Sequence, residues 1–413
     1  ELNAAKKDRY PLAEDVRKAI RDLETLAAAN PERNMSYGLL LDAREDYASV
    51  TEDITSAFGA LRDKRRFFAC LRSKAWERKR GALMQFGDFV LRHDSCAFRG
   101  IWGETGEPKY VITLDSDSIL VDARRLVGMM EHPYNADVNV MSLSMRARIS
   151  SLVTPFARFL CGDKGYSRYA CGNSLSFDAY GLGNYTGKGI YRVAAFDKIL
   201  RHALPENRVL SHDMLEGAYA GCAESGICGT EDHPLCYSSF IARAGRWMRG
   251  DLQLLPWLFP FVRNAKGERV RNPLSATARC AVLTGILRVL APVGSVVLLA
   301  VAAVIDMPWL IAVAFARQAL GIFLTMLGQS PSPRVFREIA VQIWWAAQMP
   351  AYGAMCACCV VVTAVRMTAR KGLLTWKTFS PGGSVGAMIP GALAFGALFA
   401  VFGILHMSVA LVA

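Results

Sequence analysis

The segment Tyr110-Val-Ile-Thr-Leu-Asp-Ser-Asp117 decides the fold, because it joins a short apolar run to two carboxylates. A short apolar run bounded by turn residues is typical of a strand that is buried in a sheet. Two earlier segments have the same character: residues 35–42, which also end in a carboxylate, and residues 67–71. We therefore expect strands at 35–42, 67–71 and 110–114, with polar side chains at their carboxyl ends.

Helical patterns alternate with these strands. Residues 1–34 contain an amphipathic helix, closed by Asn30 and Pro31, whose apolar side chains recur at helical spacing: Leu12, Val16, Ile20, Leu23 and Leu26. A second helical pattern follows at 50–64. Alternating strands and helices predict an α/β domain over residues 35–272, with a mostly parallel sheet and helices on both faces. Ligands of such sheets bind at the carboxyl ends of the strands.

The apolar residues are unevenly distributed along the chain. They make up 52% of the 413 residues, and the mean hydropathy is +0.21, which is high for a wholly soluble protein. Residues 1–272 have a mixed, charged composition, whereas residues 278–413 contain long apolar windows and hardly an acidic residue. We therefore expect a domain boundary near Asn272 and Pro273.

The net charge of +12 suggests an acidic partner. Three kinds of partner would fit: a nucleic acid, anionic lipid headgroups and a phosphorylated substrate. No nucleic-acid-binding motif accompanies the charge, so we expect no nucleic-acid partner. Many of the basic residues flank the apolar windows, as is typical of cytoplasmic loops: Arg263, Lys266, Arg269, Arg271, Arg366, Arg370, Lys371 and Lys377. The lipid bilayer is therefore an expected partner.

The eleven cysteines are scattered without a Cys-x-x-Cys pair, which argues against a zinc site and against a disulfide framework. Reduced thiols in a cytosolic domain are the simpler interpretation. The chain begins with Glu1, and its last apolar window runs to Ala413. We expect a piece of a longer polypeptide that carries further domains.

Two apolar windows, 278–305 and 308–327, are long enough to cross a bilayer, which takes about 20 residues. We expect two transmembrane helices in residues 273–334, and another in residues 381–413, where the apolar window is the clearest. Arg288 and Arg317 each interrupt one of the first two windows. Each arginine either turns inward to a polar pathway or a neighbour, or extends to the headgroups.

The window at 335–371 is different, because Pro350 splits it and charged residues fall at both ends. A crossing here would leave the basic run that follows outside, against the excess of Lys and Arg on cytoplasmic loops. We therefore expect residues 335–380 to lie at the cytoplasmic face as interfacial helices, broken at Pro350, with Trp344 and Trp345 at headgroup depth. A further membrane span is the alternative.

Three carboxylates are candidates for chemistry. Asp115 and Asp117 form an Asp-x-Asp motif at a strand end, where one can bind a divalent metal and the other a ribose or the same metal. Mg²⁺ or Mn²⁺ is the expected cofactor, and the structural alternative is a turn or a helix cap. Asp213, in Leu-Ser-His-Asp, is a candidate general base for an acceptor hydroxyl. Its alternative is an N-cap, formed by Ser211 or Asp213, of a helix over 214–221.

Two further motifs supply positive charge and a flat ring. Arg246-Trp-Met-Arg-Gly-Asp251 offers a guanidinium for a diphosphate and Trp247 for a sugar ring, and the alternative is an amphipathic helix that packs onto the membrane. In Gly187-Lys188-Gly189 the backbone can approach a ligand closely and Lys188 adds a charge, and a simple turn is the alternative. This loop is not a P-loop, because Gly-x-x-x-x-Gly-Lys-Ser/Thr does not occur.

The order of these motifs resembles the catalytic core of membrane-bound, processive GT-A glycosyltransferases such as the cellulose synthases. The matching segments are Asp42 after the first strand, Lys79-Arg80-Gly81-Ala82-Leu83, Asp115 with Asp117, Asp213 in the place of the base, and Arg243-Ala-Gly-Arg246-Trp247. The last segment resembles a Gln-x-x-Arg-Trp motif, with Arg243 in the place of Gln.

Longer sequence segments resemble a narrower family, the glycosyltransferase domain of cyclic β-1,2-glucan synthases. These segments are Trp76-Glu-Arg-Lys-Arg-Gly-Ala-Leu83, Tyr185-Thr-Gly-Lys-Gly-Ile-Tyr191, Pro205-Glu-Asn-Arg-Val-Leu-Ser-His-Asp213, Arg246-Trp-Met-Arg-Gly-Asp-Leu-Gln-Leu-Leu-Pro-Trp257, Arg271-Asn-Pro-Leu274 and Leu373-Leu-Thr-Trp376. The similarity extends over residues 35–380. The stretch 171–183 departs from the family's pattern at Ser174, Ser176 and Leu182, which concerns the acceptor side.

The resemblance implies a role for each matching residue. The general base is Asp213, and the metal is held by Asp117 with Asp115. Contacts with the donor fall to Asp42, Lys79, Asp115 and Arg246, and contacts with the acceptor or substrate fall to Lys188, Gly189, Tyr191, Arg243 and Trp247.

The resemblance also implies a reaction. The chain would be an inverting, metal-dependent hexosyltransferase that adds glucose from UDP-glucose to a growing β-1,2-glucan. The implied location is a bacterial inner (plasma) membrane, which the chain crosses several times, with the catalytic domain in the cytosol. Three alternatives stay open: a processive synthase of another β-glycan, a transferase with a lipid-phosphate acceptor, and a non-catalytic membrane scaffold that binds a nucleotide sugar.

Overall fold

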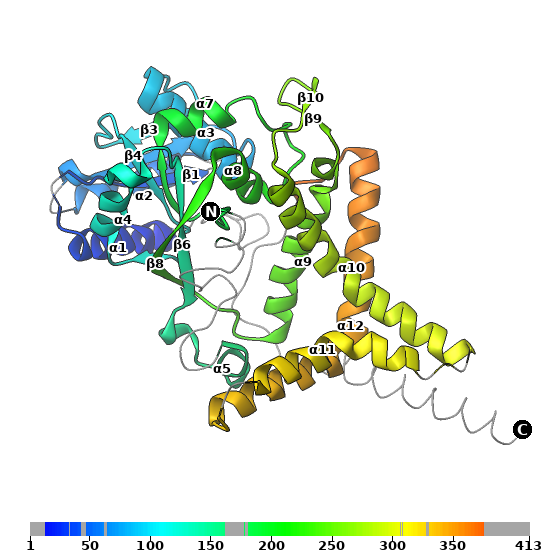
Figure 1. Ribbon diagram of the computed structural model, residues 1–413. Helices are drawn as coiled ribbons and strands as arrows, with labels where there is room; N and C mark the ends of the chain where they lie inside the picture. The colour runs from blue at the N-terminus through cyan, green and yellow to red at the C-terminus, as the bar shows by residue number, and fades with distance from the viewer. Residues whose placement is uncertain are drawn as a thin grey trace, which may run out of the picture.

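A computed structural model describes residues 13–375, apart from residues 33, 43–46, 62–63, 162–176, 178–180, 306, 308 and 328–329. Within these residues the chain forms a mixed α/β domain followed by three long apolar helices (Figure 1). The α/β fold that the sequence predicts is therefore confirmed, and apolar helices that could span a membrane follow it.

The three expected strands are present as β1 (Tyr37–Asp42), β2 (Phe67–Arg72) and β4 (Tyr110–Thr113). Every residue of β2 is buried, which explains its continuous apolar run. The other strands of the α/β domain are β3 (Phe98–Trp102), β5 (Ile119–Leu120), β6 (Val140–Ala147), β7 (Gly189–Arg192) and β8 (Cys222–Glu231).

Helices surround these strands. They are α1 (Ala13–Ala29), α2 (Tyr47–Gly59), α3 (Arg78–Arg92), α4 (Ala123–Glu131), α5 (Pro155–Cys161), α7 (Val193–Leu200), α8 (His212–Ala220) and α9 (Tyr237–Gln253), with short 3-10 turns at Lys64–Arg66, Pro133–Asn135 and Ile149–Ser151. The amphipathic pattern expected near the start of the chain corresponds to α1. Its Val16 and Ile20 pack with Leu41 of β1 and Ile54 of α2 in one apolar core.

The strands pair in a mixed pattern. The larger sheet has the strand order β4-β7-β6-β8-β5, and a second sheet has the order β1-β2-β3. The pairs β1/β2 and β6/β8 are parallel, whereas β3, β4, β5 and β7 pair with their neighbours in the antiparallel sense. The sheet is less parallel than the sequence predicts, because β7 lies between β4 and β6 and runs opposite to both. An apolar run identifies a strand but not its partner.

The position of β7 brings two loops to one edge of the sheet. The register pairs Thr113 of β4 with Gly189 of β7. A Cβ at Gly189 would lie 2.0 Å from the carbonyl oxygen of Met141 in β6, so a larger residue cannot occupy this position without moving the strands apart. Because the two strands run in opposite directions, the residues after Thr113 and those before Gly189 share this edge.

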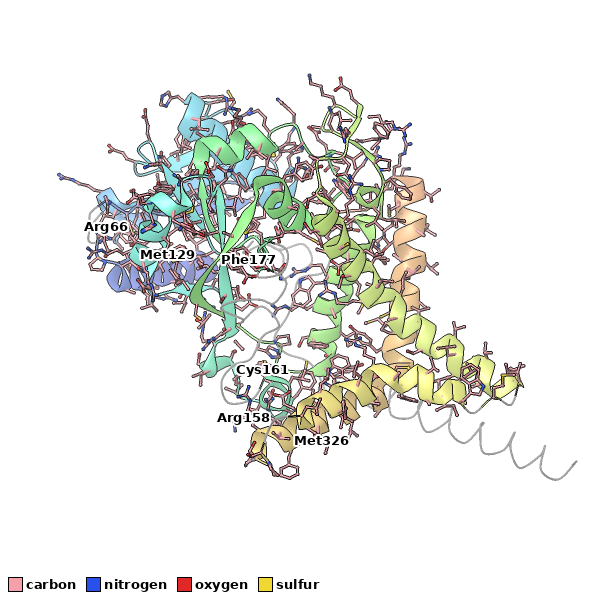
Figure 2. The ribbon with its side chains drawn as sticks, in the orientation of Figure 1. Arg66, Met129, Arg158, Cys161, Phe177 and Met326 are labelled. Atoms are coloured by element: carbon pink, nitrogen blue, oxygen red, sulfur yellow. The ribbon has the colours of Figure 1, made fainter. Side chains whose placement is uncertain are left out.

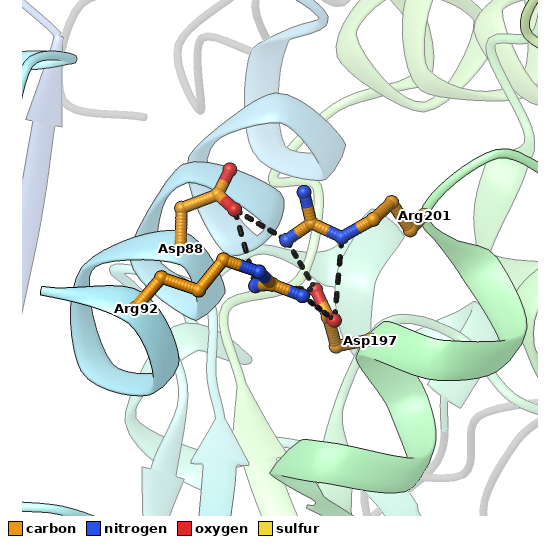
Figure 3. A network of polar contacts seen from close by, with 4 residues as sticks. All are labelled: Asp88, Arg92, Asp197 and Arg201. Carbon is orange, nitrogen blue, oxygen red and sulfur yellow. Dashed lines mark hydrogen bonds and ion pairs between the residues drawn. The ribbon is translucent and has the colours of Figure 1, made fainter. Parts of the chain in front are cut away.

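A network of four charged side chains joins α3 to α7 (Figure 3). Arg201 is 2.8 Å from Asp197 and Arg92 is 3.2 Å from Asp88, and each arginine also pairs with the aspartate of the other helix. Burial raises the pKa of Asp197, but its hydrogen bonds with Arg201 and Arg92 outweigh this effect and lower it. The network holds α3, whose first residues belong to the Trp76–Leu83 segment, against α7, the helix that follows β7.

We expect Asp197→Asn to lower the free energy of unfolding by about 1 kcal/mol, because it weakens pairs with two arginines in a partly exposed network. Thermal unfolding in detergent measures the effect, which should shrink as salt is added. The control is Glu107→Gln, at a side chain that is 82% exposed, and its unfolding midpoint should not change. A midpoint for Asp197→Asn equal to that of the wild type at low salt would contradict the prediction.

Three helices are long and apolar enough to cross a membrane among the described residues: α10 (Ala276–Ile305), α11 (Trp309–Met326) and α12 (Pro333–Ala369). The first two coincide with the windows expected at 278–305 and 308–327. The 3-10 helix η4 (Leu255–Leu258) and the hairpin of β9 (Phe261–Arg263) and β10 (Arg269–Arg271) connect α9 to α10. Arg288 of α10 turns to a neighbour, Asp251 of α9, at 3.8 Å. The expected span at 387–413 lies outside the described residues.

The helix α12 differs from the expected pair of helices, because it continues through Pro350 without a break. A proline inside a helix removes one backbone hydrogen bond, and tight packing offsets this cost here. A Cβ at Gly353 would lie 2.7 Å from the carbonyl oxygen of Pro292 in α10, so the two helices are in backbone contact. The expected break at Pro350 is therefore wrong, since packing against α10 outweighs the local preference of proline.

Both ends of α12 contact the α/β domain. At its start Arg337 donates to the carbonyl oxygen of Phe159 in α5 at 3.2 Å, and α5 is the helix that carries Arg158 and Cys161 in Figure 2. Just beyond its end, the carbonyl oxygen of Leu373 accepts from Gln253 of α9 at 3.0 Å. Trp344, expected at headgroup depth, packs edge-on against Phe156 and Tyr237.

Candidate functional site

Asp115 lies just beyond β4 and is paired with two lysines. Lys79, from the first turn of α3, contacts one carboxylate oxygen, and Lys188, from the loop before β7, is 2.8 Å from the other. Burial raises the pKa of Asp115, but the charges of Lys188 and Lys79 outweigh burial and hold it well below its usual range. Asp115 is therefore ionised throughout the physiological range, and both of its oxygens are in use.

Asp117 has the opposite electrostatic environment. Burial raises its pKa, and the negative charge of Asp115 raises it further. Its carboxylate forms no ion pair with the residues that the structure describes, although Arg148 donates to its backbone carbonyl oxygen at 2.5 Å. Of the two carboxylates in the Asp-x-Asp motif, Asp117 is therefore the one whose oxygens are available to a cation.

Lys188 extends the network away from Asp115. Its ammonium is also 2.7 Å from Glu231, the last residue of β8, and Glu231 is 2.7 Å from Arg243 of α9. The Arg243 guanidinium lies 4.6 Å from the centre of the Trp247 ring, which is a cation–π contact. Alternating charges thus connect the end of β4 to the aromatic face of α9. Sequence analysis missed Glu231, although a carboxylate at a strand end is the signal that identified Asp115.

Asp213 lies in the first turn of α8, and the N-cap position is occupied by Ser211, whose side chain makes no capping hydrogen bond. The capping alternative for Asp213 is therefore wrong. The backbone of Gly187 lies against its carboxylate: a Cβ at Gly187 would lie 2.8 Å from Oδ1 of Asp213. With a φ of 73°, Gly187 has a conformation that favours glycine. The Thr113 hydroxyl holds this loop by donating to the Gly187 carbonyl oxygen at 3.0 Å.

The loop before β7 therefore assembles the site. Gly187 contacts Asp213, and the next residue, Lys188, contacts Asp115. Two carboxylates that are about a hundred residues apart in the sequence lie on either side of one short loop. The structure therefore brings Asp115 and Asp213 to one loop.

His212 lies between two carboxylates. Its Nδ1 is 3.0 Å from Asp213 and 3.0 Å from Glu216, and Glu216 is buried. Burial lowers the pKa of His212, but Glu216 and Asp213 outweigh it and raise the value to about 9. The potential ligand atoms of these residues all lie within 4.8 Å of one another. A histidine must be neutral to bind a metal, so the protonated ring favours ion pairing with the carboxylates over a cation site.

The other predicted residues occupy varied environments. Asp42 is 2.5 Å from the buried Arg72, which also donates to the Trp76 carbonyl oxygen at 2.9 Å, so Asp42 lies beside the start of α3. Tyr191 is only 3% exposed and its ring stacks on Phe196, which gives it a packing role. Its expected contact with substrate stays a prediction.

Arg246 and Trp247 are half-buried on α9. An adjacent side of this helix carries Ala244 and Met248, which pack with Val289 of α10 and Cys356 of α12. The helix therefore fits both interpretations of its motif. The side with Ala244 and Met248 packs on the membrane helices, and the adjacent side with Arg243 and Trp247 faces the charged network.

No protein-family model matches the chain. The chain is 34% identical over 317 aligned residues to the cyclic β-(1,2)-glucan synthase NdvB of Rhizobium meliloti. The alignment covers 66% of this chain and 11% of the synthase, so the chain spans about a tenth of the length of this curated relative. This chain is related to that synthase.

The relationship to a cyclic β-(1,2)-glucan synthase confirms the resemblance that the longer matching segments indicate. The departure from the family pattern at Ser174 and Ser176 lies outside the described residues. Leu182 is half-buried and packs at the edge of the core that contains Leu204, Leu215 and Trp257.

The raised pKa of His212 predicts a pH dependence of stability. The folded pKa of His212 exceeds its ordinary value of 6.5, so its ion pairs stabilise the fold below pH 6.5, and this stabilisation is lost as the pH rises through about 9. We therefore expect the difference in thermal unfolding midpoint between the wild type and His212→Asn to decrease over this range. A difference that stays constant with pH would contradict the prediction.

Proposed function

We propose that this chain is a glycosyltransferase that transfers glucose from UDP-glucose to a growing β-1,2-glucan, with inversion at the anomeric carbon. The observation that carries the proposal is the loop of Gly187 and Lys188, which holds Asp213 beside the end of the strand that bears Asp115. The relationship to a cyclic β-(1,2)-glucan synthase supports the glucan and its linkage. A GT-A arrangement is consistent with the Asp-x-Asp at the end of β4.

The proposed reaction needs one base. The acceptor hydroxyl attacks the anomeric carbon, the bond from that carbon to the phosphate oxygen breaks, and UDP leaves with the bonding electrons. Asp213 accepts the proton of the hydroxyl, because within the described residues it pairs with His212 and not with a lysine, and it lies at a loop that can approach a ligand closely. A single displacement of this kind inverts the anomeric carbon and requires no covalent intermediate on the enzyme.

The remaining contacts are divided between the two substrates. Asp42 lies at the end of β1, and Lys79 lies at the start of α3. The uridine and the diphosphate of the donor would bind there. Arg246 adds a guanidinium that can pair with the diphosphate. Trp247 offers an aromatic face for a sugar ring of the acceptor. Arg243 supports the Trp247 ring from its other side.

A divalent metal fits Asp117 better than Asp115. Oxygen-ligated Mg²⁺ typically uses one or two carboxylates together with phosphate oxygens. Both oxygens of Asp115 are paired with lysines, whereas the carboxylate of Asp117 has a raised pKa from burial and from Asp115, which a cation would relieve. When bound, Mg²⁺ or Mn²⁺ would neutralise charge on the leaving diphosphate.

We also propose a membrane placement, which the contacts of α12 support. We place the α/β domain in the cytosol at a bacterial inner membrane, where α10 and α11 cross the bilayer. Because both ends of α12 contact the α/β domain, its ends cannot lie on opposite sides of a hydrocarbon core about 30 Å thick. We propose that α12 lies along the cytoplasmic face. Further domains of a longer polypeptide would complete the protein.

The decisive test is turnover by the purified protein in detergent or nanodiscs with UDP-glucose and Mg²⁺. We expect release of UDP and formation of a glucan whose linkage analysis gives β-1,2 bonds. Asp213→Asn should lower kcat by at least about a hundredfold, since it removes the proton acceptor. The control is Asp137→Asn, at an exposed residue outside the site, which should retain full activity. Wild-type turnover in Asp213→Asn would refute the assignment of the base, and another linkage would indicate another glycan.

The placement of α12 predicts which residues are accessible from each side of the membrane. A membrane-impermeant maleimide should label Arg334→Cys and Lys371→Cys, beside the two ends of α12, from the same side as Lys198→Cys in α7. Met307→Cys, between α10 and α11, should be labelled from the opposite side. Vesicles of known orientation provide the readout, measured as labelling above the wild-type cysteines. Labelling of positions 334 and 371 from opposite sides would show that α12 crosses the membrane.

A further inference from the structure

The ammonium of Lys188 lies between two carboxylates in a nearly closed environment. It is 2.8 Å from Asp115 and 2.7 Å from Glu231, and the Lys188 and Glu231 side chains are 10% and 8% exposed. An isolated buried charge is strongly unfavourable, so each carboxylate contributes to holding the lysine in place. Glu231 is the partner that the proposed chemistry does not use. Its position therefore requires an explanation.

Glu231 divides its two oxygens between two cations. One oxygen accepts from Lys188, and the other is 2.7 Å from Arg243, whose guanidinium lies 4.6 Å from the centre of the Trp247 ring. Lys188, which the resemblance assigns to the acceptor or substrate, pairs with the donor-side carboxylate Asp115, and Arg243 contacts the acceptor-side Trp247. The Glu231 carboxylate thus connects Lys188, on the side of Asp115, directly to Arg243, on the side of Trp247.

The backbone of Glu231 is fixed as well. Its carbonyl oxygen accepts from the backbone N–H of Arg148 at 2.7 Å, and the Arg148 guanidinium donates to the carbonyl oxygen of Asp117 at 2.5 Å. Burial raises the pKa of Glu231, but Lys188 and Arg243 outweigh it and lower the value, so the side chain stays ionised. A fixed, ionised carboxylate can orient both cations at once.

We infer that Glu231 is a positioning residue that sets donor and acceptor contacts together, by holding Lys188 on Asp115 and Arg243 on Trp247. This inference rests on the proposed function. Without the negative charge, Lys188 keeps Asp115 as its ion-pair partner among the described residues, and Arg243 keeps a hydrogen bond with the Asp232 carbonyl oxygen but loses the carboxylate that fixes its plane over Trp247. Both binding steps then weaken, although Glu231 touches neither substrate.

The test is Glu231→Gln in the full chain, with two readouts. Calorimetric titration with UDP reports the donor site without turnover, and initial rates with UDP-glucose and a β-1,2-linked glucan oligosaccharide give kcat and a KM for each substrate. We expect weaker UDP binding and a raised KM for the acceptor, each by roughly tenfold, a size typical of residues that orient the groups of a polar site. The matched control is Glu224→Gln, on the same strand β8, which should change neither value.

A double-mutant cycle separates positioning from a general loss of stability. Glu231→Gln combined with Arg243→Lys should raise the acceptor KM no more than the larger single effect, because both changes break one link. Glu231→Asp retains the charge and should recover part of both affinities, including where Glu231→Gln folds poorly.

Unchanged UDP affinity and acceptor KM in Glu231→Gln, or additive effects in the cycle, would overturn the inference. Failure of the wild type to bind UDP or to release it from UDP-glucose would instead overturn the proposed function.

Discussion

The ion pairs of one buried cation, Lys188, organise the centre of this molecule. Burial alone makes an ammonium unstable, and only the carboxylates of Asp115 and Glu231 on either side make its position favourable. These pairs fix the loop that precedes β7. Because Gly187 is the neighbouring residue, fixing Lys188 also fixes the backbone that lies against Asp213. Three segments that are distant in the sequence are therefore positioned by a single charge.

The charge of Lys188 also helps to give the carboxylates of the site different pKa values and different partners. Asp115, paired with two lysines, is held ionised, whereas burial and the nearby charge of Asp115 raise the pKa of Asp117. Asp213 is paired with His212 and not with a lysine. Adjacent acids in different environments can take different roles, and these differences are the physical basis for assigning a diphosphate-side carboxylate, a cation-binding carboxylate and a base.

The parts of the fold that were predicted from the sequence are those that depend on neighbouring residues. The apolar runs gave β1, β2 and β4, and Gly221 marked the end of α8. The strand order was beyond such reasoning, because the antiparallel insertion of β7 depends on partners far along the chain. Glu231 looked like an ordinary polar residue for the same reason. At Pro350 a local rule failed, since packing against α10 keeps α12 helical through the proline.

The helix α9 connects the site to the membrane segments through adjacent residues. Trp247 faces the Arg243–Glu231 network, whereas Met248, the next residue, contacts Cys356 of α12. Further along, Gln253 bonds both the Leu210 backbone N–H, three residues before Asp213, at 2.8 Å and the Leu373 carbonyl oxygen beyond α12 at 3.0 Å. A shift of α12 would therefore move the region around Trp247 and the segment that leads to Asp213 together, because adjacent residues of one helix connect both to α12.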